Sequence, residues 1–122
     1  MSWDFKKGIP IYSQIIRKLE LDLLSGKYQV GEKLPSVRDL AMEANVNPNT
    51  MQRALVEMER SGLIYSERTT GRFVTLEQKR IDDLKDELSK EYFDQFFESL
   101  YSLGFSDKEI VLAVKRKCKM ED

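Results

Sequence analysis

Amide and guanidinium side chains gather on one side of a short expected helix in this sequence. Asn49, Gln52 and Arg53 lie on its outer face, and Asn47 stands at its entry. Such side chains can meet base edges or phosphates in a DNA groove, and an asparagine amide can pair bidentately with adenine. The stretch from Lys33 to Leu76 therefore predicts a surface for contacting nucleic acid.

The composition argues against an enzyme or a metal protein. The 122 residues include no histidine, which is the commonest general base and transition-metal ligand. The single cysteine, Cys118, cannot form an internal disulfide. Apolar runs are short and the N-terminus lacks the apolar block of a secretory signal. We therefore expect a cytoplasmic protein, not membrane-bound, with no catalytic residues, metal or cofactor.

The charge distribution is a weak signal for nucleic-acid binding. Residues 1–76 carry 11 Lys/Arg and 9 Asp/Glu, whereas residues 77–122 carry 9 and 12, which together give the net charge of −1. A strongly basic domain would be a clearer indication. Affinity would depend on individually placed cations and on amides at helix N-termini. A winged-helix module for protein interaction, without specific DNA binding, remains the alternative function.

Three expected helices and a hairpin position the polar side chains. The apolar spacing predicts a helix over 11–25, a capping box begins a second over 36–44, and an Asn-Pro pair begins a third over 47–60. Extended runs over 63–67 and 72–76 read as a hairpin. This order predicts a mainly α fold with a small β-hairpin, a winged helix-turn-helix. The expected core includes Val37, Leu40, Ala41, Met42, Val46, Met51, Ala54, Leu55 and Met58.

The C-terminal part predicts a long amphipathic helix, then a last helix that begins at a Ser106–Glu109 capping box. We expect residues 1–76 to form the DNA-binding domain and residues 77–122 a helical extension. Two such helices are too small to form a stable core by themselves. We therefore expect their apolar surface to pack against the same helices of a second subunit in a homodimer. Alternatively, the helices fold back on their own domain or enclose an unidentified small-molecule effector. The residues expected to form the dimer are Leu84, Leu88, Tyr92, Phe93, Phe96, Phe97, Leu100, Val111 and Val114.

Three segments in order resemble a known family. GKYQVGEKLPSVRDLA, NVNPNTMQRALVEMERSGLI and GRFV are similar to the DNA-binding domain of GntR-family bacterial transcription regulators. The short helical extension resembles that of the YtrA-like subfamily. The resemblance implies a dimeric regulator, usually a repressor, that binds a palindromic operator in double-stranded DNA. Members of the subfamily are often linked to transporter operons.

The resemblance also implies contacts at matching positions. Ser36 and Arg38, at the start of the second helix, correspond to residues that grip phosphate or reach a base edge. Thr50 and Arg53 correspond to contacts of the recognition helix, and we expect Arg38 and Arg53 to matter most. Gln52 stands where many relatives have arginine.

The expected wing tip departs from the family pattern. Relatives often carry glycine directly after the basic residue of the wing, whereas this chain has Thr69 and Thr70 between Arg68 and Gly71. An approach of Arg68 to the minor groove is the expected contact of this tip.

Each of these contacts has a structural alternative. Arg38 could pair with Asp39 or Glu43 on the surface. Asn47 could act as a helix cap alone, and Thr50 could satisfy nearby backbone groups. The order of the motifs favours DNA contact for Arg38, whereas the two possibilities for Asn47 are evenly balanced.

Overall fold

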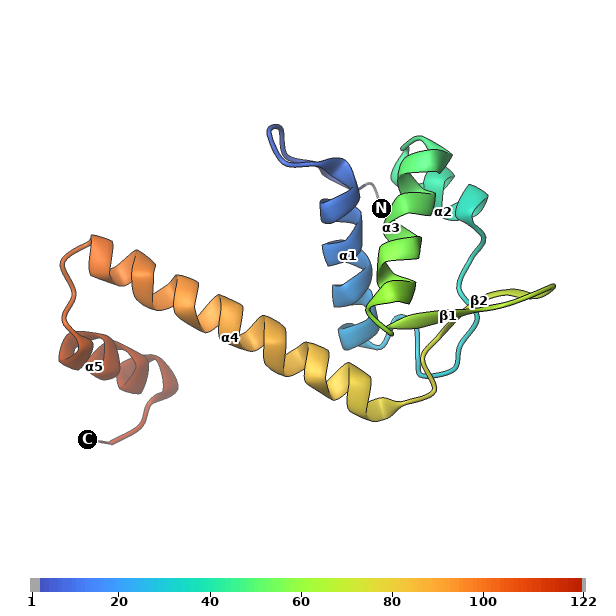
Figure 1. The fold of residues 1–122 in the computed structure, drawn as a ribbon. Helices are drawn as coiled ribbons and strands as arrows, with labels where there is room; N and C mark the ends of the chain where they lie inside the picture. Colours follow the sequence, from blue (N-terminus) through green and yellow to red (C-terminus); the bar gives the residue numbers. More distant parts are fainter. Residues whose placement is uncertain (1–2, 122) are drawn as a thin grey trace. The chain divides into compact units, whose positions relative to one another are not determined.

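The computed structural model describes residues 3–121 (Figure 1). Within these residues, five helices and a two-stranded antiparallel sheet form a mainly helical fold, as the sequence predicts. The chain divides into two compact units, Met1–Leu84 and Lys85–Asp122, which are described separately. The elements are α1 (Ile11–Ser25), α2 (Val37–Ala44), α3 (Pro48–Arg60), β1 (Ile64–Glu67), β2 (Gly71–Val74), α4 (Gln78–Ser102) and α5 (Asp107–Cys118).

Local signals set the ends of the first helices. α1 follows Pro10 and ends at Gly26, whose φ of 85° lies in the left-handed region that glycine adopts readily. α2 begins at Ser36, whose hydroxyl accepts a hydrogen bond of 3.1 Å from the Asp39 N–H. This bond is the serine half of the predicted capping box.

The core of the first unit lies where α3 packs against both α1 and α2 (Figure 1). Ile15, Leu40 and Met51 are completely buried there. The predicted buried face of α3 is confirmed: Met51, Ala54, Leu55 and Met58.

One prediction for this core is wrong. Met42 was expected in the core but is 74% exposed, because α2 turns Leu40, Ala41 and Ala44 inward and places Met42 on the opposite side. Two other expected core residues, Val37 and Val46, are half-buried.

The hairpin follows α3 directly. Ile64 pairs with Val74 and Glu67 with Gly71. β1 begins one residue later than predicted, whereas β2 begins one residue earlier and ends two residues earlier. Lys33 adds an isolated antiparallel bridge to Phe73, and the Leu34 N–H donates to the Arg72 carbonyl at 2.9 Å. The hairpin is thereby joined to the segment that leads into α2.

The first compact unit extends beyond the predicted domain boundary at residue 76. Ile81 and Leu84 in the first turns of α4 are buried, and the Arg80 guanidinium donates to the Ser61 carbonyl at 2.9 Å. The start of α4 is therefore part of the same compact unit as the winged domain. The functional division into 1–76 and 77–122 stays a prediction, and its outer limits, residues 1 and 122, lie outside the described residues.

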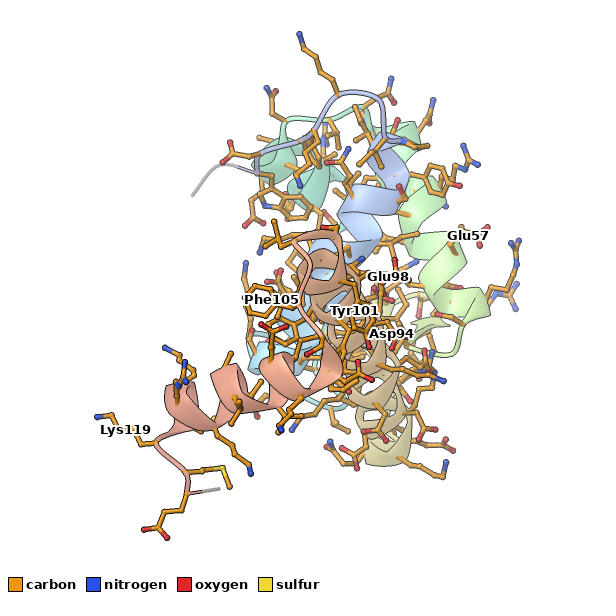
Figure 2. All side chains as sticks on the ribbon, turned by 90° about the vertical axis from the view of Figure 1, so that its left-hand side faces the viewer. Glu57, Asp94, Glu98, Tyr101, Phe105 and Lys119 are labelled. Atoms are coloured by element: carbon orange, nitrogen blue, oxygen red, sulfur yellow. The ribbon has the colours of Figure 1, made fainter. Side chains whose placement is uncertain are left out.

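The second unit contains the rest of α4 and α5. The predicted capping box of α5 is confirmed, with reciprocal bonds between Ser106 and Glu109. The Tyr101 hydroxyl donates to the Asp107 carboxylate, which ties the end of α4 to the start of α5. Figure 2 labels Tyr101 on α4 and Phe105 in the turn that follows it. Ile110 is the completely buried residue of α5.

Candidate nucleic-acid interface

The start of α2 presents an unpaired cation. Arg38 is exposed, and within residues 3–121 it forms no ion pair or side-chain hydrogen bond. The alternative pairing with Glu43 is not formed; the Glu43 carboxylate instead lies 3.6 Å from Lys27 Nζ. The Arg38 guanidinium therefore keeps all its donors for a ligand.

A tight turn sets the entry of the recognition helix. Asn45 ends α2 in the left-handed region (φ 56°), and Asn47 then caps α3 by accepting a hydrogen bond of 2.7 Å from the Asn49 N–H. Pro48 occupies the first turn, where its missing N–H costs nothing. The cap uses the side-chain oxygen Oδ1 of Asn47, so the exposed Asn49 side-chain amide is the freer of the two for pairing with a base. Thr50 is half-buried.

The outer face of α3 carries Gln52 and Arg53, both exposed. The Arg53 guanidinium carbon lies 3.7 Å from the centre of the Tyr12 ring on α1, which places the cation over the aromatic face. Arg60, at the other end of the same helix, is instead neutralised by Glu57 at 2.5 Å.

The wing presents its predicted contacts at an exposed tip. Arg68, Thr69 and Thr70 lie between β1 and β2 and are all exposed. The basic residue that follows, Arg72, is turned toward α3 and pairs with Glu59 at 2.5 Å.

Glu59 joins the recognition helix to the wing. One of its carboxylate oxygens, Oε1, accepts hydrogen bonds from Ser66 Oγ at 2.7 Å and Arg72 Nε at 2.5 Å. Burial raises the pKa of Glu59, but these two bonds and the charge of Arg72 outweigh it, so the pKa lies below its ordinary value. The ionised Glu59 carboxylate therefore stabilises the position of the hairpin relative to α3.

A hollow of about 490 Å³ brings two predicted contacts together. Ser36 lines it from the start of α2 and Thr70 lines it from the wing. Ser36 and Thr70, both predicted to contact DNA, thus border one concave surface. The hollow is lined by Lys33, Leu34, Pro35, Ser36, Val37, Asp39, Thr70, Gly71 and Arg72.

A second candidate surface lies on the helical extension. Phe97 is the centre of an aromatic cluster, with ring centroids 4.6 Å from Phe93, 5.9 Å from Phe96 and 5.8 Å from Tyr101. Five of the residues expected to form the dimer are exposed: Tyr92, Phe93, Phe96, Val111 and Val114. Tyr101, which the prediction did not include, is exposed beside them. Phe97 and Leu100 are half-buried. Leu84 and Leu88 are already buried in the single chain, so they add no exposed surface for a partner.

Two contacts of this region escaped the sequence analysis. The Tyr12–Arg53 stack joins residues of different helices, and the Glu59–Arg72 pair joins a helix to a strand. The aromatic residue near the start of α1 and the opposite charges are visible in the sequence. Their pairing is not, because no helical or strand period relates positions on separate elements.

The described part of the chain contains neither a membrane-spanning helix nor a metal-binding cluster. Among residues 3–121, no helix has the length and apolar character needed to cross a membrane. Nor do His, Cys, Asp or Glu side chains of that part of the chain gather into a group of three suited to hold a metal ion.

The order of α1, α2, α3 and the β1–β2 wing defines a winged helix-turn-helix, a class of DNA-binding domain. Residues 11–74 match the bacterial regulatory proteins of the gntR family, and the chain belongs to this family. It is therefore a transcriptional regulator with a DNA-binding domain.

Relatives similar along most of their length support this assignment. The chain is 36% identical to the uncharacterized HTH-type transcriptional regulator YhcF of Bacillus subtilis, over 94% of this chain and 95% of that protein. It is 35% identical to the HTH-type transcriptional repressor YtrA of the same organism, over 77% of each chain. A solved GntR family transcriptional regulator from Listeria monocytogenes is 37% identical with a TM-score of 0.85, over 92% of this chain and 98% of that one. The likeness therefore includes the helical extension.

Proposed function

We propose that this protein binds a palindromic operator in double-stranded DNA as a homodimer and represses transcription. The observation that carries the proposal is the set of exposed polar side chains on α2, α3 and the wing tip, held on a rigid winged domain. Arg38 and Arg53 are its principal contacts in this proposal. The proposed function also requires a cytoplasmic location, because bacterial DNA lies in the cytoplasm.

Several features support a DNA-binding face here despite the net charge of −1. Arg38 and Arg53 are exposed and have no acidic partner within residues 3–121. Asn49 and Gln52 add amides for base edges, and Arg68 extends from the wing tip. The remaining proposed contacts are Ser36, Asn47, Thr50, Thr69 and Thr70.

The aromatic cluster around Phe97 supports the homodimer. Monomeric proteins seldom leave a contiguous apolar surface of several large side chains in water. Phe93 is 59% exposed and Tyr101 47%. In a two-fold symmetric dimer, this surface would be covered by the same surface of the second subunit. The same symmetry would suit a palindromic site, whose half-sites lie about 34 Å apart, which is one turn of DNA.

The repressor role rests on similarity. The relative that matches over 77% of both chains is a repressor. The operon that this protein controls is a further part of the proposal, and a transporter operon is the expectation from the subfamily.

Selection of bound fragments from genomic DNA tests the function. Purified full-length protein should enrich fragments that share an inverted repeat, and their positions would identify the regulated genes. Enrichment of no reproducible sequence would contradict the proposal and would favour the protein-interaction alternative. Reporter expression with and without the protein then separates repression from activation.

Replacing Arg53 by alanine tests the interface itself. The variant should bind the selected fragment with about 1–3 kcal/mol less free energy, roughly 5- to 150-fold weaker. Its thermal midpoint should stay close to that of the wild type, because Arg53 is exposed. Arg60→Ala is the matched control on the same helix: Arg60 pairs with Glu57 and should be dispensable. Equal affinities of the two variants in a gel-shift titration would refute the role of Arg53.

A further inference from the structure

The ring of Tyr12 lies directly against the guanidinium group of Arg53. The distance of 3.7 Å between the guanidinium carbon and the ring centre is a stacking distance, well inside the range of about 6 Å for cation–π contacts. Tyr12 is the second residue of α1 and is half-buried. α1 packs against α3, and this packing brings Tyr12 next to Arg53.

The stack differs from the other arginine contacts of this region. Arg60 and Arg72 each have an acidic partner at 2.5 Å, which neutralises their charge and occupies a donor. Within residues 3–121, Arg53 has no acidic partner, so the N–H donors of its guanidinium stay available beside the Tyr12 ring. The ring therefore restricts the side chain without using its hydrogen-bonding capacity.

This restriction matters for binding because a free arginine side chain carries about 2 kcal/mol of rotamer entropy. A side chain already held in one orientation loses less of that entropy when it meets a base or phosphate. We propose that Tyr12 is a positioning residue for operator binding, which holds Arg53 on the outer face of α3 in the orientation that contacts DNA. The inference rests on the proposed function, because it requires Arg53 to contact DNA.

Two substitutions at Tyr12 separate the aromatic face from its other properties. Tyr12→Phe keeps the ring and removes the hydroxyl, whereas Tyr12→Leu keeps an apolar side chain suited to a helix and removes the ring. Each is made in the full-length chain, alone and together with Arg53→Ala. The affinity for a fragment that the wild type selects from genomic DNA is measured by fluorescence anisotropy, and the thermal midpoint of each variant is recorded.

The expected pattern is specific to positioning. Tyr12→Phe should bind within about twofold of the wild type, and Tyr12→Leu about 2- to 5-fold more weakly. In the Arg53→Ala background, Tyr12→Leu should cause no further loss, because no guanidinium remains to be oriented. A residue that only supports the fold would lower affinity equally in both backgrounds.

Several results would overturn the inference. One is an affinity of Tyr12→Leu that equals or exceeds that of the wild type. A second is a loss of affinity in Tyr12→Phe as large as that in Tyr12→Leu. A third is a loss of affinity caused by Tyr12→Leu that remains in the Arg53→Ala background. If Arg53→Ala itself binds normally, there is no contact for Tyr12 to position, and the inference fails although the selected DNA still supports the proposed function. If the wild type selects no DNA, the proposed function fails instead.

Discussion

Replacing Phe93 by alanine should weaken the proposed homodimer strongly. Phe93 projects from the aromatic cluster of the extension and lies 4.6 Å from Phe97, centroid to centroid. Alanine is the best helix former, so α4 should be preserved and the change should act on the exposed surface. The test is therefore one of association rather than of folding.

The size of the effect follows from the exposed area. Phe93 is 59% exposed, and because a phenylalanine buries roughly 200 Å² when fully covered, a partner can remove about 120 Å² per copy from water. At about 25 cal/mol per Å² this is about 3 kcal/mol per copy and about 6 kcal/mol for a symmetric pair. Incomplete coverage and ordering of side chains reduce this gain. We expect a loss of about 3 kcal/mol, roughly a hundredfold in the dimer Kd.

Sedimentation velocity over a range of concentrations measures this Kd. Met42→Ala is the matched control, because Met42 is also a large exposed apolar residue, at 74%, but lies on α2. Met42→Ala should dimerise like the wild type. An unchanged Kd for Phe93→Ala, with normal helix content by circular dichroism, would show that the dimer does not use this cluster. A monomeric wild type would reject the dimer itself.

Two further predictions concern stability. Asn47→Ala removes the cap bond to the Asn49 N–H and should cost about 1 kcal/mol, which lowers the thermal midpoint of a chain of 122 residues by about 4 °C. Glu59→Gln should cost about 1 kcal/mol at pH 7 by weakening the bonds from Ser66 and Arg72. The pKa of Glu59 is lowered in the folded chain, so its contribution is complete above its ordinary value of 4.5 and is lost as the pH falls through the folded pKa. Thermal melts at pH 7 and pH 3 should therefore show a smaller acid-induced loss for Glu59→Gln than for the wild type.

Each of these predictions has its own control. Asn49→Ala leaves the cap oxygen in place, so its thermal midpoint should match the wild type. An equal drop for both asparagine variants would mean that the cap bond is not the cause. For Glu59, an acid-induced loss as large in Glu59→Gln as in the wild type would assign that loss to other carboxylates.

The order of elements could be predicted from the sequence because its signals are local. The Asn47–Pro48 pair begins α3, Gly26 ends α1, and Ser106 with Glu109 begins α5. In each case the chemistry of a few neighbouring residues satisfies the free backbone groups of a helix end. The buried face of α3 followed from the helical period for the same reason, since that period depends only on backbone geometry.

Which face of each helix is buried, and against which element, could be determined only from the tertiary structure. The period of a helix says which residues share a face, but not which face meets a neighbour, and Met42 was therefore placed wrongly in the core. Similarly, one apolar stripe on α4 is buried at Leu84 and Leu88 but exposed at Tyr92 and Phe96. Whether a turn of α4 is buried or exposed depends on which residues pack against that turn.

By itself, then, the sequence determined the winged helix-turn-helix order and the residue types of its outer face. The tertiary structure decided how those side chains are held. It places Tyr12 against Arg53, Glu59 against Arg72 and Glu43 near Lys27. The physical reason is that such contacts depend on how separate elements are oriented toward each other, which the packing of the whole core determines and no local pattern encodes.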